Sequence, residues 1–343
     1  MRLLPRRHDA VLNRITYLPE TVREPAPVPW PAGCAPSAAS TALLPDGALP
    51  PADVLVITWT AAEALALSQI FTPGVTSKDW THYAHDFSAY KKQLTSRSPA
   101  KSAQRLGEFH MASLGGHNGA AALKVCCFHS QLHPATDAAS LPAAQLAAQI
   151  ASETGAQLVI TTGTAGGGPG TILGDVVVAT AIHSDCTTSL KGHPWSQEEW
   201  ATATLTPRQS ALLSPATIAP VLAANAGAMP KQYVTRPLEV QYGHCVSVDF
   251  FAFYDTTDHY GLLKFDPQLK CEEMDDFAIA AGVHTLKTVP ALASVRCASD
   301  PPMPDGSAAS KKLAEKIYQD WGQDAAWGSA ATSVLLAAGL LPA

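Results

Sequence analysis

Short apolar runs rich in β-branched residues alternate along this chain with longer segments of helical periodicity. The runs that predict strands are DVLVIT (53–58), LKVCCF (123–128), LVITT (158–162), DVVVATAI (175–182), CVSV (245–248) and PALASVRCAS (290–299). Helical patterns cover residues 61–71, 138–155, 273–283, 310–321 and 329–341, and Gly155 is placed to end the second of them. Short buried strands that alternate with helices predict a single α/β domain with a largely parallel or mixed sheet.

The pattern weakens at two places. Residues 1–50 are rich in proline and alanine and have no sustained period, so we separate them as an N-terminal arm from a domain at 51–343. The arm either lies over the domain or a neighbouring subunit, or extends without order. Residues 185–240 form a long excursion between strands that is able to cover a site. Sites in such folds lie beyond the carboxyl ends of the strands.

Composition narrows the class of protein. Hydrophobic residues make up 47% of the chain and charged residues 15%, which is typical of a globular protein. The net charge is −6 and no basic block stands out, which argues against a nucleic-acid partner. The seven cysteines include no CxxC pair, so they indicate neither a disulfide framework nor a zinc site.

The chain also lacks membrane signals. No apolar stretch approaches the ~20 residues that span a bilayer. The first residues, MRLLPRRHDAVLNR, are not followed by the apolar core of a secretory signal. We therefore expect a cytoplasmic protein without membrane contact.

The segment LVITTGTAGGGPGTILGDVVV (158–178) carries the clearest chemical signal. A predicted strand runs directly into a glycine-rich stretch, where a ligand can approach the backbone closely because glycine has no Cβ. The segment is not a P-loop, because Pro169 stands where the lysine belongs, and it lacks the GxGxxG spacing of dinucleotide sites. Taken alone, it is equally consistent with a tight turn that binds nothing.

The stretch ITTGTAGG followed by GDVVV resembles the signature of the nucleoside phosphorylase/nucleosidase superfamily. Four further segments are similar to that family and occur in the expected order: VITWTAAEALAL (56–67), VSVDFF (246–251), CEEMDDFAIAAGV (271–283) and VRCASDPP (295–302). The resemblance covers roughly residues 53–340. It implies a three-layer α/β fold, phosphorylase/hydrolase-like, with a mixed central sheet flanked by helices. It also implies cleavage of the N-glycosidic bond of a nucleoside, without a metal or an organic cofactor.

Two carboxylates are the candidate catalytic residues. When an N-glycosidic bond breaks, the departing base gains negative charge, and a positioned acid that protonates it contributes ~10²–10⁴-fold. The resemblance makes Asp300 that acid, which favours a purine base. Read without the family, Asp300 is more simply a cap of the turn that follows. The resemblance makes Glu63 the base that activates the attacking water, whereas a carboxylate that points outward from an apolar helix is the alternative.

The same matches supply the candidate binding residues. Thr164, Ala165 and Gly166 would line the ribose and base, and Phe251 would stack on the base. Ser299 would orient the carboxyl group of Asp300. Phe251 is otherwise an ordinary aromatic residue of the core.

The ribose is expected to contact the start of a helix. The resemblance places Met274 against the sugar and Asp275 where the family usually has a glutamate, so the side chain here is one methylene shorter and Glu273 would assist. Arg296 would pair with a neighbouring carboxylate. Core packing of Met274 and helix-dipole stabilisation by Asp275 are the structural alternatives.

The attacking group is expected to be water. The family's phosphorylases usually carry a Gly-x-Pro-x-Arg segment after the first strand, but here that place reads TWTAAEAL, and Arg105 stands alone as a further cation. Phosphate binding needs several such donors. We therefore expect a nucleosidase, with a nucleoside phosphorylase as the alternative and a non-catalytic nucleoside sensor as a third hypothesis. The family also implies a homo-oligomer.

Overall fold

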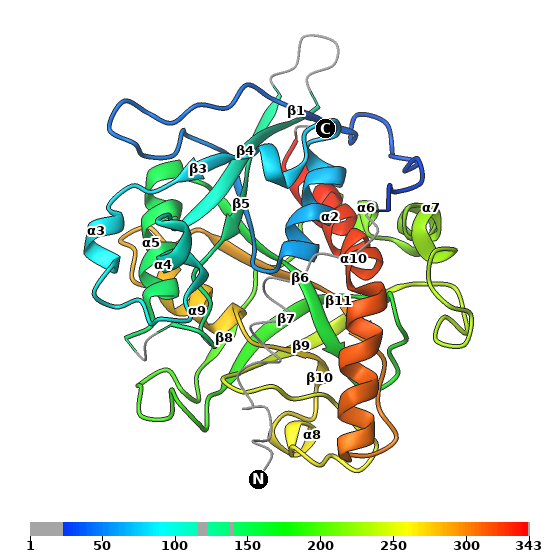
Figure 1. Ribbon diagram of the computed structural model, residues 1–343. Coiled ribbons are helices and arrows are strands. Elements are labelled where there is room, and N and C mark those ends of the chain that lie inside the picture. The colour runs from blue at the N-terminus through cyan, green and yellow to red at the C-terminus, as the bar shows by residue number, and fades with distance from the viewer. Residues whose placement is uncertain (1–22, 116–121, 138–139, 342–343) are drawn as a thin grey trace.

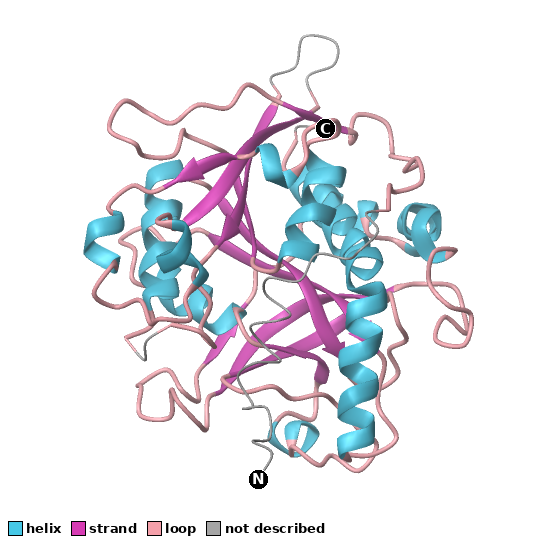
Figure 2. Cartoon of the chain, viewed as in Figure 1, coloured by secondary structure: helices cyan, strands magenta, loops and turns pink. Residues whose placement is uncertain are grey.

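The computed structural model describes residues 23–115, 122–137 and 140–341, and it places a central sheet between two groups of helices (Figures 1 and 2). On one side lie α2 (Ala61–Phe71), α6 (Pro207–Leu212), α7 (Pro215–Ala226) and α10 (Ala308–Ala338). On the other lie α3 (Phe87–Tyr90), α4 (Pro99–Ala103), α5 (Pro142–Thr154) and α9 (Asp276–Val283). Two short helices, η1 (Ser77–Asp79) and α8 (Leu262–Phe265), complete the set within these ranges. The predicted three-layer α/β fold is confirmed.

Eleven strands of the described chain form one mixed sheet. Nine follow the order β1-β4-β5-β2-β6-β10-β9-β7-β11, while β3 pairs with β4 and β8 pairs with β7. Their bounds are β1 (Pro36–Ala38), β2 (Val54–Thr58), β3 (Thr81–Tyr83), β4 (Gly107–Leu114), β5 (Leu123–Ser130), β6 (Leu158–Gly167), β7 (Val176–Asp185), β8 (Glu199–Ala201), β9 (Val240–Val248), β10 (Leu269–Glu273) and β11 (Ala291–Asp300). Because β6 also pairs with β11, the strands β6, β10, β9, β7 and β11 close into a ring. The parallel strands β2, β6 and β11 end at the same edge.

The two faces of the sheet are buried by different helices. Along β2, Val54 and Val56 contact the core that includes α2 and α10, while Leu55 and Ile57 contact the core that includes α5 and α9. Successive side chains of a strand point to opposite faces, so a strand covered on both faces is apolar throughout. Helices packed on both faces therefore fix the position of the sheet, and with it the carboxyl ends of its strands.

Several boundaries differ from the prediction. The glycine-rich stretch after residue 162, expected as a loop, continues β6 to Gly167, because β10 and β11 pair with it on either side. Glu273 ends β10 instead of starting a helix, and α9 begins at Asp276. The two helices predicted at the C-terminus are one continuous helix, α10. Strands β1, β3, β4, β8 and β10 were not predicted, because they are short or mix polar with apolar residues.

The helix predicted from residue 138 begins at Pro142 as described, and residues 138–139 lie outside the described residues. Its predicted end at Gly155 is confirmed: this glycine adopts a left-handed φ of 60° as the C-cap. No helix within the described ranges is both long and apolar enough to cross a membrane.

The part of the N-terminal segment that the structure describes contacts the domain. Strand β1 pairs antiparallel with β4, and Leu49 is fully buried. Arg23 forms an ion pair with Asp324 of α10 at 2.5 Å. Residues 1–22 of the predicted arm lie outside the described residues. In the 185–240 excursion, α6 and α7 share a core with α10.

Candidate active site

A pocket opens beyond the carboxyl ends of β2, β6 and β11, where β10 pairs with the end of β6. It brings together most of the residues predicted for the site: Glu63, Thr164, Ala165, Gly166, Phe251, Glu273, Met274, Asp275, Ser299 and Asp300. Six residues that were not predicted also line it: Thr60, His133, Val248, Ala252, Glu272 and Tyr318. Arg296 lies beneath the pocket and is almost fully buried. Segments separated by more than 200 residues in sequence therefore meet at one place.

Glu63 is held as an ionised carboxylate at the start of α2. Its backbone N–H is capped by the hydroxyl of Thr60, and its Oε2 accepts the N–H of Thr60 at 2.9 Å, which completes a capping box. Its Oε1 accepts both the N–H and the hydroxyl of Thr164, at 2.7 and 2.6 Å. Burial acts to raise the pKa of Glu63, but the charge of Arg296 and these hydrogen bonds outweigh it and hold the pKa below its usual range.

Close packing around Glu63 explains one of the glycines. A Cβ built on Gly163 would lie 2.6 Å from Glu63 Oε1, so no other residue fits there without displacing the carboxylate. Oε2 also accepts the hydroxyl of Thr58 at 3.1 Å and the N–H of Trp59 at 3.3 Å. Five donors therefore surround the two oxygens, which is more than the roughly four lone-pair sites of a carboxylate.

Asp300 ends β11 and faces the pocket from a buried position, with 2% of its surface exposed. The hydroxyl of Ser299 lies 3.0 Å from Asp300 Oδ1 and 3.1 Å from the carbonyl oxygen of Ala165. Gly166 lies directly below: a Cβ built there would overlap Glu272 Oε1 and lie 3.4 Å from Asp300 Oδ2. The glycine thus lets two carboxyl groups approach the β6 backbone from β10 and β11.

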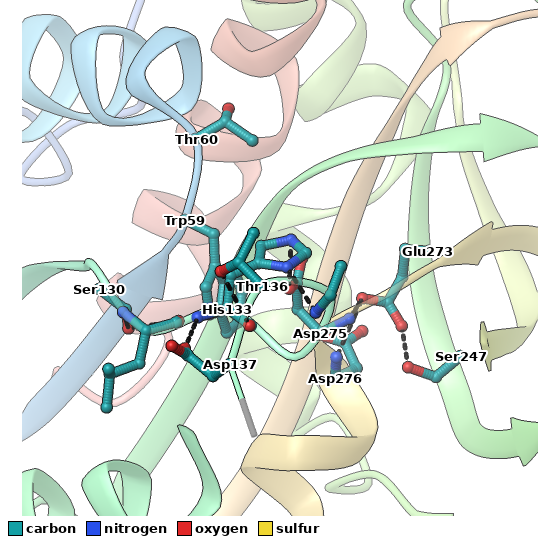
Figure 3. A network of polar contacts seen from close by, with 12 residues as sticks. Trp59, Thr60, Ser130, His133, Thr136, Asp137, Ser247, Glu273, Asp275 and Asp276 are labelled. Carbon is teal, nitrogen blue, oxygen red and sulfur yellow. Dashed lines mark hydrogen bonds and ion pairs between the residues drawn. The ribbon is translucent and has the colours of Figure 1, made fainter. Parts of the chain in front are cut away.

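The acidic residues at the start of α9 have separate partners. Glu273 Oε2 accepts the backbone N–H groups of Asp275 and Asp276, at 2.5 and 2.9 Å, and so caps the helix. Asp276 pairs with Arg296 and accepts the hydroxyl of Ser294 at 2.6 Å. Arg296 also lies 3.0 Å from Glu273. Figure 3 shows these acidic groups together, with Ser247 donating to Glu273 from β9.

The charges in this cluster do not balance. Arg296 is one cation next to Glu273, Asp275, Asp276 and Glu63, and all of these side chains are buried. Burial and the charge of Asp276 raise the pKa of Glu273 to about 7. Burial and the charge of Glu273 hold the pKa of Asp275 well above its usual range. The cluster therefore retains protons on carboxyl groups near neutral pH, where isolated carboxyl groups have none.

His133 approaches Asp275 from the loop after β5, with its Nε2 3.0 Å from Asp275 Oδ1 (Figure 3). The backbone N–H of Ala135 donates to His133 Nδ1 at 3.0 Å, so the proton of the neutral ring is on Nε2 and faces the aspartate. Burial lowers the pKa of His133 to about 4, and the charge of Arg296 lowers it further against an opposing contribution from Glu63. The imidazole is thus a neutral donor at the wall of the pocket.

Comparison with known proteins settles the family. The family model described as the phosphorylase superfamily matches residues 82–327. The chain belongs to this superfamily. No curated protein sequence matches it.

Solved structures show the same phosphorylase-superfamily fold. They include the 5′-methylthioadenosine/S-adenosylhomocysteine nucleosidase from Helicobacter pylori in complex with butyl-thio-DADMe-Immucillin-A, and the futalosine hydrolase of the same species. Each is 16% identical to this chain, covers 82% of it and 96% of its own length, and has a TM-score of 0.51. At this identity the similarity establishes the fold and leaves the reaction to be argued from the site.

Sequence reasoning about this superfamily member missed His133 and Glu272. His133 follows the strand predicted at 123–128, at the edge where the site lies, but no motif marks it. Glu272 stands beside Glu273 in the recognised segment, but only the pairing of β10 with β6 places its side chain over Gly166. Arg105 lies in a different cavity, where it pairs with Glu108.

Proposed function

We propose that this protein cleaves the N-glycosidic bond of a purine nucleoside by hydrolysis. The observation that carries the proposal is that Asp300, Asp275 and Glu63, from three distant segments, line a single pocket. Each supplies a function that this cleavage requires: an acid for the base, a hydrogen-bonding group for the ribose, and a negative charge near the attacking water.

Asp300 is proposed to protonate the departing purine. A base that leaves as a neutral molecule avoids a full negative charge in the transition state. Asp300 is almost completely buried, and the hydroxyl of Ser299 contacts its Oδ1, so its Oδ2 is oriented toward the space above Gly166. Phe251 lines the same pocket and offers a ring against which the base can stack.

Asp275 and Met274 are proposed to hold the ribose. His133 faces Asp275 Oδ1, which leaves Asp275 Oδ2 for a sugar hydroxyl. A carboxyl oxygen there can accept a hydrogen bond from a hydroxyl group of the ribose. Glu273 does not assist at the ribose in this arrangement, because its oxygens serve the start of α9, Ser247 and Arg296.

The attacking water is proposed to bind at Thr164. The oxygens of Glu63 are surrounded by donors, so the water does not contact this carboxylate directly. The Thr164 hydroxyl donates to Glu63, so the lone pairs on its own oxygen remain able to accept from a water. Glu63 then acts through Thr164: its charge stabilises the positive charge that develops on the ribose, and as the water bonds to the sugar its proton passes to the Thr164 hydroxyl while the proton of that hydroxyl passes to Glu63.

Hydrolysis is favoured over phosphorolysis by the charge of the site. The described residues that line the pocket include neither lysine nor arginine but do include Glu63, Glu272, Glu273, Asp275 and Asp300. Arg296, the cation beneath, is already paired with Asp276 and Glu273. Phosphate would meet like charge in a buried place, which costs free energy. The two solved fold relatives are named a nucleosidase and a hydrolase, in agreement with this choice.

The test is to incubate the purified protein with a panel of purine and pyrimidine nucleosides, with and without phosphate, and to measure free base and sugar products by chromatography. Release of purine base and free ribose without phosphate is the expected result. Formation of ribose 1-phosphate, and only when phosphate is present, would show a phosphorylase. Tight binding of nucleoside without release of base would show a sensor.

A further inference from the structure

A second cavity, of about 500 Å³, adjoins the candidate active site. Phe251 and Met274 line both spaces, so only these side chains lie between the two. The second cavity is bounded by the loop at Thr188 and Ser189, by His259, and by Lys311 from the first turns of α10. Thr188 and Ser189 belong to the 185–240 excursion, which the sequence indicates as able to cover a site.

The orientation proposed for the nucleoside points its 5′ carbon toward this cavity. When the base lies at Asp300 and the ribose hydroxyl groups lie at Asp275, the 5′ carbon of the sugar extends past Met274, which lines both spaces. This step rests on the proposed function. A 5′-hydroxyl group fills only a small part of about 500 Å³, so the cavity fits a larger 5′ substituent.

The side chains of the second cavity match an anion. Lys311 Nζ lies 5.1 Å from the centre of the Phe251 ring, at the junction of the two spaces, and its nearest acidic neighbour along α10, Glu315, is 3.9 Å away. The loop at Thr188 and Ser189 also lines the cavity, but its hydroxyl groups donate to Asp249, that of Thr188 to the carbonyl oxygen at 3.1 Å and that of Ser189 to the carboxylate at 3.5 Å. Asp249 also borders the cavity.

The carboxylate of Asp249 forms its hydrogen bonds with the loop that contains Thr187 to Leu190. Its carboxylate accepts the backbone N–H groups of Thr187 and Thr188 at 3.1 Å and of Leu190 at 2.7 Å. It thereby fixes the loop that carries Thr188 and Ser189. Lys311 is therefore the main charge that an occupant of the cavity would meet.

We propose that the protein acts on nucleosides whose 5′ substituent is negatively charged, with Lys311 as the residue that recognises the charge. A phosphate group and the carboxylate of an amino-acid side chain share this chemistry. Both accept charge-assisted hydrogen bonds from an ammonium group.

The test compares four adenine compounds: adenosine and 5′-methylthioadenosine, which are neutral at the 5′ position, and adenosine 5′-monophosphate and 5′-S-(2-carboxyethyl)-5′-thioadenosine, whose 5′ groups carry a phosphate and a carboxylate without an ammonium group. The wild-type protein is expected to prefer one charged substrate by about 10- to 100-fold in kcat/KM, the usual strength of a charge-assisted hydrogen bond. Lys311→Met should remove that preference and change the neutral substrates by less than about threefold. Lys312→Met, at the next and exposed position of α10, is the matched control and should resemble wild type.

The outcomes are distinguishable from failure of the proposed function. Base release with equal or better rates on the neutral substrates, or an equal loss on all four in Lys311→Met, overturns this inference while the nucleosidase stands. If no substrate releases base, the proposed function fails, and calorimetric titration with adenosine and with adenosine 5′-monophosphate still measures the preference. Equal binding of these two by the wild type would then overturn the inference as well. Of the two charged substrates, the one that Lys311→Met impairs identifies phosphate or carboxylate as the group recognised.

Discussion

His133 Nε2 faces Asp275 Oδ1 at 3.0 Å across the wall of the pocket, and both side chains are buried. The backbone N–H of Ala135 fixes the tautomer by donating to the other ring nitrogen, so the imidazole can only donate toward Asp275. Burial lowers the pKa of the histidine and raises that of the aspartate. The imidazole is therefore neutral near pH 7, and it lies against the proposed ribose-binding carboxyl group without a permanent charge.

This relationship predicts a specific dependence of stability on pH. The pKa of His133 falls from about 6.5 when unfolded to about 4 when folded. Between these two pH values the imidazole takes up a proton in the unfolded chain but not in the folded one. The contribution of His133 to the stability of the fold is therefore fully present above pH 6.5 and is lost as the pH falls toward 4. Each pKa unit corresponds to about 1.4 kcal/mol. Replacing His133 by glutamine should remove this dependence, so the difference in unfolding free energy between wild type and variant should shrink by about 2–3 kcal/mol from pH 7 to pH 4.5.

Urea unfolding of both proteins at several pH values measures that difference. Glu273, whose pKa is raised to about 7, has the opposite effect, because its stabilisation decreases as the pH rises from 4.5 through 7. Because Glu273 is present in both proteins, its contribution largely cancels in the difference between their unfolding free energies. His259→Gln, at an exposed position, should follow the wild type at every pH. A wild-type-minus-variant difference that stays constant with pH would show that His133 is not held neutral.

Asp300→Asn should abolish most turnover without impairing the fold. Asparagine keeps the shape of the side chain and an oxygen for the Ser299 hydroxyl, but it cannot protonate a base. We expect kcat to fall by about 10²–10⁴-fold while nucleoside binding and the melting temperature change little. Asp320→Asn, at an exposed position of α10, is the control and should keep full activity. More than a tenth of wild-type turnover in Asp300→Asn would exclude this residue as the acid.

The fold could be predicted from the sequence to the extent that strands and helices are amphipathic or uniformly apolar. The strands β2, β6, β7 and β11 and the helices α2 and α5 have such patterns, and the motif order gave the family. Strand β10 could not be found in this way, because LKCEE carries two glutamates whose burial depends on neighbours far away in sequence. The closed ring of strands could not be predicted either, because it depends on the pairing of β6 with both β10 and β11, which are distant in sequence.

The site could be predicted as a set of residues but not as a set of contacts. The resemblance placed Glu63 and Asp275 near a nucleoside. It could not show that Thr164 donates hydrogen bonds to the carboxylate of Glu63, or that His133 lies against Asp275. It also gave no reason to join His183, His244 and Asp266, which meet because β7 and β9 are neighbours; both imidazole Nδ1 atoms contact the same carboxylate oxygen. Such contacts depend on which strands are neighbours in the sheet, and the pattern within a single strand does not specify its neighbours.

Thr164 separates the two possible roles of Glu63. If Glu63 acts through the Thr164 hydroxyl, Thr164→Val should lower kcat by about 10²-fold, because valine keeps the volume and removes the oxygen. Thr164→Ser keeps the hydroxyl and should retain most activity, which makes it the matched control. Both variants are checked for folding by circular dichroism and thermal melting, since Thr164→Val also removes one of the donors to Glu63. Equal activity of the two variants would instead favour direct contact between Glu63 and the attacking water.

Gly166→Ala tests whether the β6 backbone forms the floor of the site. A Cβ at this position would overlap the carboxyl group of Glu272 and come within 3.4 Å of Asp300, from neighbouring strands that cannot move apart without breaking the sheet. Overpacking of this kind costs about 1–3 kcal/mol, and a displaced Asp300 would no longer be aligned with the base. We therefore expect a lower melting temperature together with a loss of turnover of about 10²-fold. Gly192→Ala, where a Cβ meets no atom within 4 Å, should change neither quantity. If Gly166→Ala keeps full turnover, the nucleoside does not lie over this part of β6.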